Sequence, residues 1–369
     1  SLADYAATWQ TYNVTVAPDG TDKIGSVNEN AILNTQGQSV TFVYVDSTQG
    51  WINTMDSTSN VRGLPPFVAA TGGTIITSSC GNFKSHVFTG PGTFCVSSAG
   101  TPAGSNTVDY FIVAGGGASR YIAAPSGHSS SGGGGGFRVS NSYSIPAPTM
   151  SPLANPTTIP ISEQGYPITV GGGGTSPPSI PGGTQAPTGS VSTFSTITSA
   201  GGGGGGTTGV GGAGGSGGSG SQGPTPTSGY SGGSGNTPPV SPPQGNPGGA
   251  GYDGISSSNN SGGGGGAGAA GGNAGPSAGG IGGAGSFIAD AFIGPTAPSY
   301  GTPGPVGSTR YFAGGGGGST DSGGGVGGVG GGGSGNPSPT SGTINTGGGA
   351  GARSAGGGSG IVIIRYKFQ

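Results

Sequence analysis

The stretch Thr107-Val108-Asp109-Tyr110-Phe111-Ile112-Val113, followed at once by Ala114-Gly115-Gly116-Gly117, decides the fold. Its first seven residues are mostly β-branched or aromatic, and such residues favour a strand. Glycine then takes over, because only 12 of the 95 glycines precede Ala114. The chain therefore changes at this junction from strand-forming sequence to glycine runs.

The C-terminal segment 361–368 has the pattern of a second strong strand. Its start, Ile361-Val362-Ile363-Ile364, is apolar at consecutive positions, as in a strand buried on both faces. A terminal tail does not need such a strand, so we expect it to return and complete a sheet. The sequence predicts an all-β protein with a small N-terminal β-module (1–62), the first strands of a β-sandwich (63–113), a glycine-rich insertion (114–360) and a closing strand (361–369).

Shorter patterns predict the remaining strands. Residues 40–45 alternate as a strand does, residues 46–50 have turn chemistry, and Trp51 begins a return strand. We interpret Trp51 as a core or interface anchor. The module is too small for a large core, so preceding residues or an oligomer must supply the rest. Further on, the sequence predicts a hairpin from 85–88 and 93–96, and single strands at 137–139, 167–170 and 191–197.

The glycine runs need a packed structure. Few charges and few apolar residues often mean disorder, but the structure covers residues 1–369, so we expect the glycine to be ordered. Polyglycine can form an extended helix with three residues per turn and no internal hydrogen bonds, so each N–H and C=O needs a partner in a neighbouring run. We therefore predict a bundle of polyglycine II helices. Such a bundle accepts Ala and Ser but no larger side chain in its interior.

Segments rich in Pro, Ser and Thr separate the runs and are expected to turn at the two ends of the bundle. Loops on a rigid scaffold often carry binding residues, and isolated aromatic side chains suit sugar stacking or protein contacts. The alternative is that each tyrosine only covers the bundle end. The loops are 118–131, 175–190, 224–247, 252–261 and 289–310, and their candidate binding residues are Arg120, Tyr121, His128, Tyr230, Tyr252 and Tyr300.

The sequence also bears on disulfide, metal, nucleic-acid, membrane and catalytic sites. Cys80 and Cys95 allow either one disulfide or two free thiols, and their spacing around His86 fits no standard zinc pattern. The net charge of −2 comes without a basic stripe, and no apolar stretch reaches the length of a membrane span. We expect no nucleic-acid partner, no membrane insertion, no metal, no cofactor and no enzymatic activity, since no paired carboxylates or nucleophile motif stand in a suitable context.

Four signatures resemble the glycine-rich domain of tailed-phage fibre proteins, particularly those of marine cyanophages. They are the 109–117 stretch, Tyr166-Pro167-Ile168-Thr169-Val170-Gly171-Gly172, Ser199-Ala200 before a six-glycine run, and Gly360-Ile361-Val362-Ile363-Ile364-Arg365-Tyr366. Residues 34–52 are similar to the small β-module that precedes this domain in those fibres. A related sandwich with inserted polyglycine helices also occurs in the anaplastic lymphoma kinase family, so fold alone does not fix function.

The resemblance implies a virion tail-fibre or fibre-tip adhesin outside the cell. Its partners are then a host surface receptor (a glycan or an outer-membrane protein), other virion fibre proteins, and further copies of itself in a homo-oligomer, expected to be a trimer. The alternative is a structural virion or extracellular filament subunit, in which the glycine bundle acts as a rigid spacer.

Overall fold

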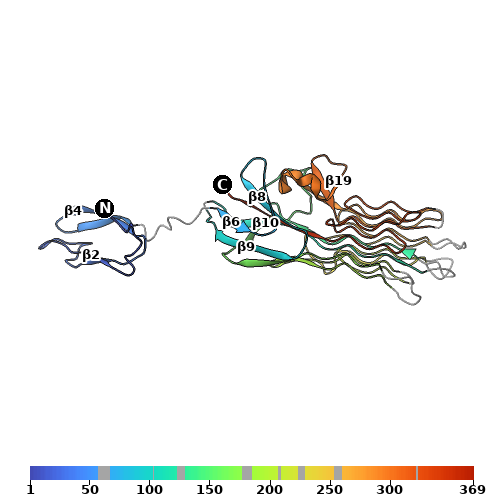
Figure 1. Cartoon of the computed structure of the whole chain (residues 1–369), viewed down its shortest axis with the longest axis horizontal. Helices are drawn as coiled ribbons and strands as arrows, with labels where there is room; N and C mark the ends of the chain where they lie inside the picture. Colours follow the sequence, from blue (N-terminus) through green and yellow to red (C-terminus); the bar gives the residue numbers. More distant parts are fainter. Residues whose placement is uncertain are drawn as a thin grey trace. The chain divides into compact units, whose positions relative to one another are not determined.

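The chain is nearly all-β, as the sequence predicts. The computed structural model describes residues 1–56, 67–102, 104–122, 129–176, 185–206, 209–222, 229–252, 260–320 and 323–369. These described residues contain 21 strands, one short α-helix and one 3-10 helix. They fall into two compact units, Ser1–Pro65 and Pro66–Gln369 (Figure 1). The boundary that we predicted after residue 62 lies outside the described residues.

The first unit contains two small antiparallel sheets, β1-β4-β5 and β2-β3. Its strands are β1 (Leu2–Ala3), β2 (Val14–Val16), β3 (Ala31–Leu33), β4 (Ser39–Asp46) and β5 (Gly50–Asp56). The predicted turn joins β4 to β5, where Asp46 Oδ1 accepts the N–H groups of Thr48 and Gln49 at 2.8 and 2.6 Å. The buried hydrophobic side chains among the described residues of this unit are only Leu33 and Val40. Its core is therefore very small.

The second unit holds the remaining elements. They are β6 (Val68–Thr71), β7 (Thr74–Thr77), β8 (Phe83–Phe88), β9 (Gly92–Ala99), β10 (Thr107–Val113), β11 (Arg120–Tyr121), β12 (Ser129–Ser130), β13 (Phe137–Val139), β14 (Ile159–Pro160), β15 (Gly165–Thr169), β16 (Ser192–Phe194), β17 (Ile197–Ser199), β18 (Ser286–Ala289), α1 (Asp290–Ile293), η1 (Ala297–Ser299), β19 (Thr302–Pro303), β20 (Thr309–Phe312) and β21 (Ile361–Lys367). The first large sheet has the order β13-β10-β21-β8-β7, with β14 also paired to β10, and the second has the order β17-β16-β15-β9-β6.

The C-terminal strand β21 lies between β10 and β8 in the first large sheet. It runs antiparallel to β10, with Val113 opposite Ile361 and Asp109 opposite Arg365. The glycine-rich segment that starts after β10 therefore ends beside its own starting point.

Both faces of β10 and β21 are buried, because side chains alternate between two hydrophobic clusters. Even-numbered residues such as Tyr110 and Ile364 join Phe94 and Phe194 of the second large sheet. Odd-numbered residues such as Phe111 join a cluster built with α1, β18 and β20. This double burial explains why the C-terminal strand is apolar at consecutive positions.

The predicted hairpin at 85–96 is wrong. Phe83–Phe88 pairs with β7 and β21, whereas Gly92–Ala99 pairs with β6 and β15, so the two strands belong to different sheets. The turn between them carries the chain from one large sheet to the other. Phe88 and Phe94, one from each strand, meet in the same hydrophobic cluster, and this burial favours the crossing over local pairing.

The strand predicted at 191–197 is divided into two. Phe194 pairs with Ile197 across a tight turn in which Ser195 has φ +52°, so β16 and β17 form a hairpin. The predicted loop 224–247 is also divided. Its later part lies beside the sheets, where the Gln244 carbonyl accepts the Phe137 N–H at 2.9 Å and its side chain accepts the Ala200 N–H at 2.9 Å.

The glycine runs extend side by side from the sheets (Figure 1), and they hydrogen-bond to one another with a period of three residues. In the run 114–119, each set of donors three residues apart bonds to one neighbouring segment. The N–H···O pairs are Ala114 to Gly136 and Gly117 to Gly133, Gly115 to Ser190 and Ala118 to Pro187, and Gly116 to Gly358 and Ser119 to Ala355. This run therefore bonds in three directions, and the partners of its N–H groups lie in other segments of the chain.

The same period recurs elsewhere in the unit. Ser261, Gly264 and Ala267 donate to Ser319, Gly316 and Ala313 in turn. The close approach leaves no room for side chains at most interior positions. A Cβ at Gly117, for example, would lie 2.1 Å from the carbonyl oxygen of Gly203. The glycine content is thus a packing requirement of the runs.

Candidate functional site

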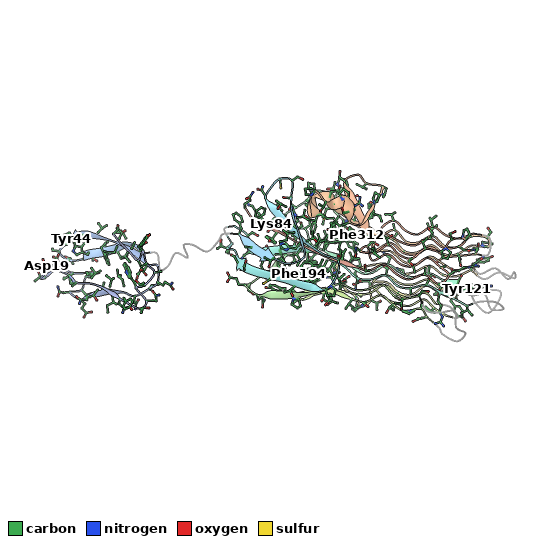
Figure 2. All side chains as sticks on the ribbon, viewed as in Figure 1. Asp19, Tyr44, Lys84, Tyr121, Phe194 and Phe312 are labelled. Atoms are coloured by element: carbon green, nitrogen blue, oxygen red, sulfur yellow. The ribbon has the colours of Figure 1, made fainter. Side chains whose placement is uncertain are left out.

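The end of the glycine runs away from the sheets carries several of the predicted binding residues, and Tyr121 marks this end in Figure 2. Tyr121 belongs to the short strand β11, which pairs with β12 so that Arg120 faces Ser130 and Tyr121 faces Ser129. The pair continues the run that leaves β10. His128, the third candidate in this loop, lies outside the described residues.

Two arginines accompany Tyr121. The Arg353 guanidinium lies over the Tyr121 ring, 5.2 Å from its centroid. Nη1 of Arg120 lies 3.5 Å from the carbonyl oxygen of Gln185. All three side chains are half-buried. Arg120 precedes Tyr121 in β11, where successive side chains point to opposite faces, so Arg353 is the cation over the ring. An aromatic ring beside a cation suits anionic or sugar ligands.

Tyr230 and Tyr252 lie on neighbouring runs. The Gly251 N–H donates to the Tyr230 carbonyl at 3.0 Å, and the Tyr252 N–H donates to the Asn260 carbonyl at 3.0 Å. Both tyrosines are half-buried. The structure therefore brings Tyr230 and Tyr252 together through the backbone.

Buried serines connect the outer parts of several runs. The hydroxyl groups of Ser129 and Ser319 are hydrogen-bonded, and the Ser131 N–H donates to Ser219 Oγ at 2.8 Å. Serine is small enough for these close approaches, and its hydroxyl provides extra hydrogen bonds where the runs approach their turns. These hydrogen bonds join neighbouring runs beside the strand pair that carries Tyr121.

The family model of the glycine-rich domain matches residues 88–367. This chain belongs to that family. The match begins at the last residue of β8 and ends with β21, so it spans β9 to β21 and all the glycine runs, and it leaves out β6, β7 and most of β8. Comparison with the curated proteins finds no match.

Tyr300 lies in a different part of the glycine-rich domain from Tyr121. It follows η1, packs against the hydrophobic cluster that contains Phe111, and accepts a hydrogen bond from Arg310 Nε to its carbonyl at 2.7 Å. Its ring contributes to the core beside the sheets. The structure therefore separates Tyr300 from the other candidates.

The two cysteines of the chain are free and exposed. Cys80 lies in the turn between β7 and β8, whereas Cys95 lies in β9 of the second large sheet, opposite Gly165. The Cys80 thiol is 3.2 Å from Ser78 Oγ. This hydrogen bond is the main cause that lowers the pKa of Cys80, with smaller effects of the Asn82 backbone and of Arg365.

His86 is a structural residue of the second unit. Its Nδ1 lies 2.7 Å from the Gly72 carbonyl and its Nε2 lies 3.0 Å from the Tyr366 hydroxyl. Because a carbonyl only accepts, Nδ1 carries the proton and Tyr366 donates to Nε2. Burial lowers the pKa of His86 and raises that of Tyr366 to about 12. The ring is therefore neutral and fully bonded.

The described parts of the chain contain no group of three or more His, Cys, Asp and Glu side chains that could hold a metal ion. No helix among the described residues has the length and hydropathy needed to cross a membrane.

Arg353 is the residue of this surface that sequence reasoning missed. It stands between two glycine runs in the segment Gly351-Ala352-Arg353-Ser354, and its positive φ of 79° places it in a turn. A charged residue between two glycine runs is a sequence signal that could have marked Arg353 as a candidate binding residue. Its partner Tyr121 lies far away in sequence, however, and no local pattern links the two.

Proposed function

We propose that this protein is a virion tail-fibre or fibre-tip adhesin that recognises a host cell surface through the end of its glycine runs. The observation that carries the proposal is the three-residue hydrogen-bonding period, which ties distant segments into one rigid scaffold. The far end of that scaffold displays Tyr121 and Arg353 in contact, with Arg120 beside them. Rigid display favours binding, because little conformational freedom is lost when the partner docks.

In this proposal the runs are polyglycine II helices. Three residues per turn is the repeat of that helix, and donors pointing in three directions are what a packed array of such helices needs. The two large sheets, which share one hydrophobic cluster, are then the layers of a β-sandwich. The sandwich holds the bundle at its base, and residues 114–360 form one insertion between β10 and β21.

The partner is proposed to be a glycan or an outer-membrane protein of the host. Partly exposed tyrosine faces suit sugar stacking, and the arginines suit acidic sugars or phosphate groups of the envelope. Contacts of this kind need no enzymatic step. The protein therefore acts by binding alone, as part of the virion outside the cell.

The first unit is proposed to form a homotrimer with two further copies and to attach to other fibre proteins. Its core is limited to Leu33 and Val40, whereas Tyr5, Tyr12 and Ile32 are 102%, 74% and 59% exposed. A unit with so little buried apolar area needs additional burial for stability. Self-association supplies that burial.

Binding of the labelled full chain to a panel of bacterial cells, cyanobacteria included, tests the proposal. We expect saturable binding to some strains, and a loss of roughly tenfold in affinity when Tyr121→Ser is combined with Arg353→Gln. Val191→Ser is the control, since it removes an exposed apolar side chain of the second unit beside the sheets, away from the run ends. Unchanged binding of the double variant, or binding to no strain at all, would overturn the proposal.

The structural alternative is a filament subunit that uses the runs as a spacer. The exposed apolar side chains of the first unit favour it, because they also suit end-to-end assembly. Electron microscopy of the purified chain distinguishes the two functions. Long filaments without cell binding support the alternative, whereas discrete trimers that bind cells support the adhesin.

A further inference from the structure

A cavity of about 550 Å³ lies beside the sheets of the second unit, and it belongs to neither the run ends nor the first unit. The turn between β7 and β8 forms one side with Ser78 and Cys80, and the α1–η1 segment forms the other with Asp290 and Pro295. Arg365 of β21 also lines it. Its volume is within the range of small-molecule sites.

Arg365 is the unusual feature of this cavity. It is only 4% exposed, yet its Nε and Nη1 atoms have no hydrogen-bond partner among the described residues. The guanidinium lies 3.8 Å from the centroid of the Phe83 ring, with Tyr143 and Phe292 at 5.7 and 5.6 Å. These aromatic faces hold the flat group in place but cannot accept its in-plane N–H bonds. A buried charged donor left in this state is costly.

The acidic residue opposite Arg365 in the sheet does not satisfy this arginine. Asp109 faces Arg365 in the sheet register, and its charge favours the protonated guanidinium. Its Oδ1, however, accepts bonds from Ser140 Oγ at 2.7 Å and from the Ser142 N–H at 3.0 Å. The counter-charge is therefore present, while the Nε and Nη1 donors of Arg365 remain unused.

A second unused group lines the same cavity. Oδ1 of Asp290 is buried and has no hydrogen-bond partner among the described residues, so it does not bond to Arg365. Arg365 and Asp290 thus line one cavity, and each has a buried polar atom without a hydrogen-bond partner in the described parts of the chain, between small apolar residues such as Ala291 and Ala297. A bound molecule with an acidic group and a donor group would complement both side chains.

We propose that this cavity binds a small carboxylate that also carries an ammonium or hydroxyl group, with the carboxylate on Arg365 and the donor on Asp290. Arginine forms strong, charge-assisted hydrogen bonds with carboxylates, which suits an arginine that lines the cavity and has N–H groups without a partner among the residues that the structure describes. Free amino acids and sugar acids of a cell envelope share this chemistry. The site is independent of the proposed receptor surface, so either can fail alone.

Equilibrium dialysis of the full chain against labelled amino acids and against glucuronate tests the site and distinguishes the two sources. We expect saturable binding of the amino acids or of glucuronate, and no binding of acetate or methylammonium, each of which has only one of the two required groups. Asp290→Asn should weaken binding by roughly tenfold or more, because it replaces a charged acceptor with a neutral one. Asp19→Asn, which makes the same change at an exposed aspartate of the first unit, is the matched control and should bind normally.

The two thiols provide a readout that needs no variant. Cys80 lines the cavity and Cys95 does not, and both are exposed. A saturating ligand should slow the alkylation of Cys80 by threefold or more and leave the rate at Cys95 unchanged. No binding of any probe at 10 mM, or equal protection of both thiols, would refute the site.

Discussion

Replacing Gly203 with alanine would place a Cβ 2.0 Å from the carbonyl oxygen of Gly212 and 2.8 Å from the nitrogen of Gly218. Ordinary contacts lie at 3.4–4 Å, so the Gly212 segment has to move by more than 1 Å. That shift breaks two short bonds, Gly212 N–H to Gly204 at 2.8 Å and Gly218 N–H to Gly212 at 2.9 Å. Each bond contributes about 1 kcal/mol, overpacking costs about 1–3 kcal/mol, and the stiffer unfolded chain returns roughly 0.5 kcal/mol. The variant should therefore lose about 2.5–4.5 kcal/mol.

Gly172→Ala is the matched control in another run. A Cβ there meets nothing within 4 Å, and Gly172 has no left-handed φ. Only the unfolded-state effect remains, so this variant should gain about 0.4–1 kcal/mol. Thermal unfolding followed by circular dichroism should show Tm about 4–12 °C lower for Gly203→Ala and slightly higher for Gly172→Ala. Equal shifts for the two variants would contradict the packed-run structure, and Gly203→Val should exaggerate the first effect.

Three further predictions concern other parts of the chain. Because burial holds the pKa of His86 below its ordinary 6.5, the unfolded chain binds a proton below that pH before the folded chain does. Stability should therefore fall as the pH drops below about 6.5. The variant His86→Gln should flatten the dependence of Tm on pH between about 7.5 and 5. An unchanged slope would show that another group controls the pH dependence. Phe111→Ala should lower the free energy of unfolding by about 3–5 kcal/mol, since Phe111 is fully buried and its ring centroid lies 4.8 Å from that of Phe312. A loss below about 1 kcal/mol would mean that neighbouring side chains repack into the cavity. Trp51→Ser, which alters a side chain 39% exposed in the first unit, should shift the full chain from trimer towards monomer in light scattering, whereas a wild-type monomer would end the oligomer proposal.

The sequence predicts those strands whose signal is local. Residues 107–113 and 361–367 were recognisable because double burial makes every position apolar, and the structure pairs them as β10 and β21. The hairpin at 85–96 was wrong because two strands that cross between sheets have the same alternation as two that pair. Deciding between the two cases requires knowledge of which distant strands, here β15 and β21, compete for each edge.

The candidate site is less predictable than the fold. The loop positions of Tyr121, Tyr230 and Tyr252 follow from the gaps between glycine runs, but Tyr300 occupies a similar gap and packs beside the core instead. The contact between Tyr121 and Arg353 joins segments far apart in the chain. The sequence places Arg365 only in a strand. That its Nε and Nη1 atoms have no hydrogen-bond partner among the described residues depends on the residues that the fold brings around it.

The adjacency of Val113 and Ile361 has a consequence for how such proteins diversify. Residues 114–360 leave and return at neighbouring strands and supply β13 to β20 on the way, so the glycine passes between these strands can change in length without changing the sheets. A pair of outward and inward passes can be duplicated or deleted while the base keeps its pairing, provided that the passes remain even in number and their contacts keep the three-residue repeat. Lineages can then remodel the tip by changing the number of passes and the short turns between them, and inherit the rest unaltered.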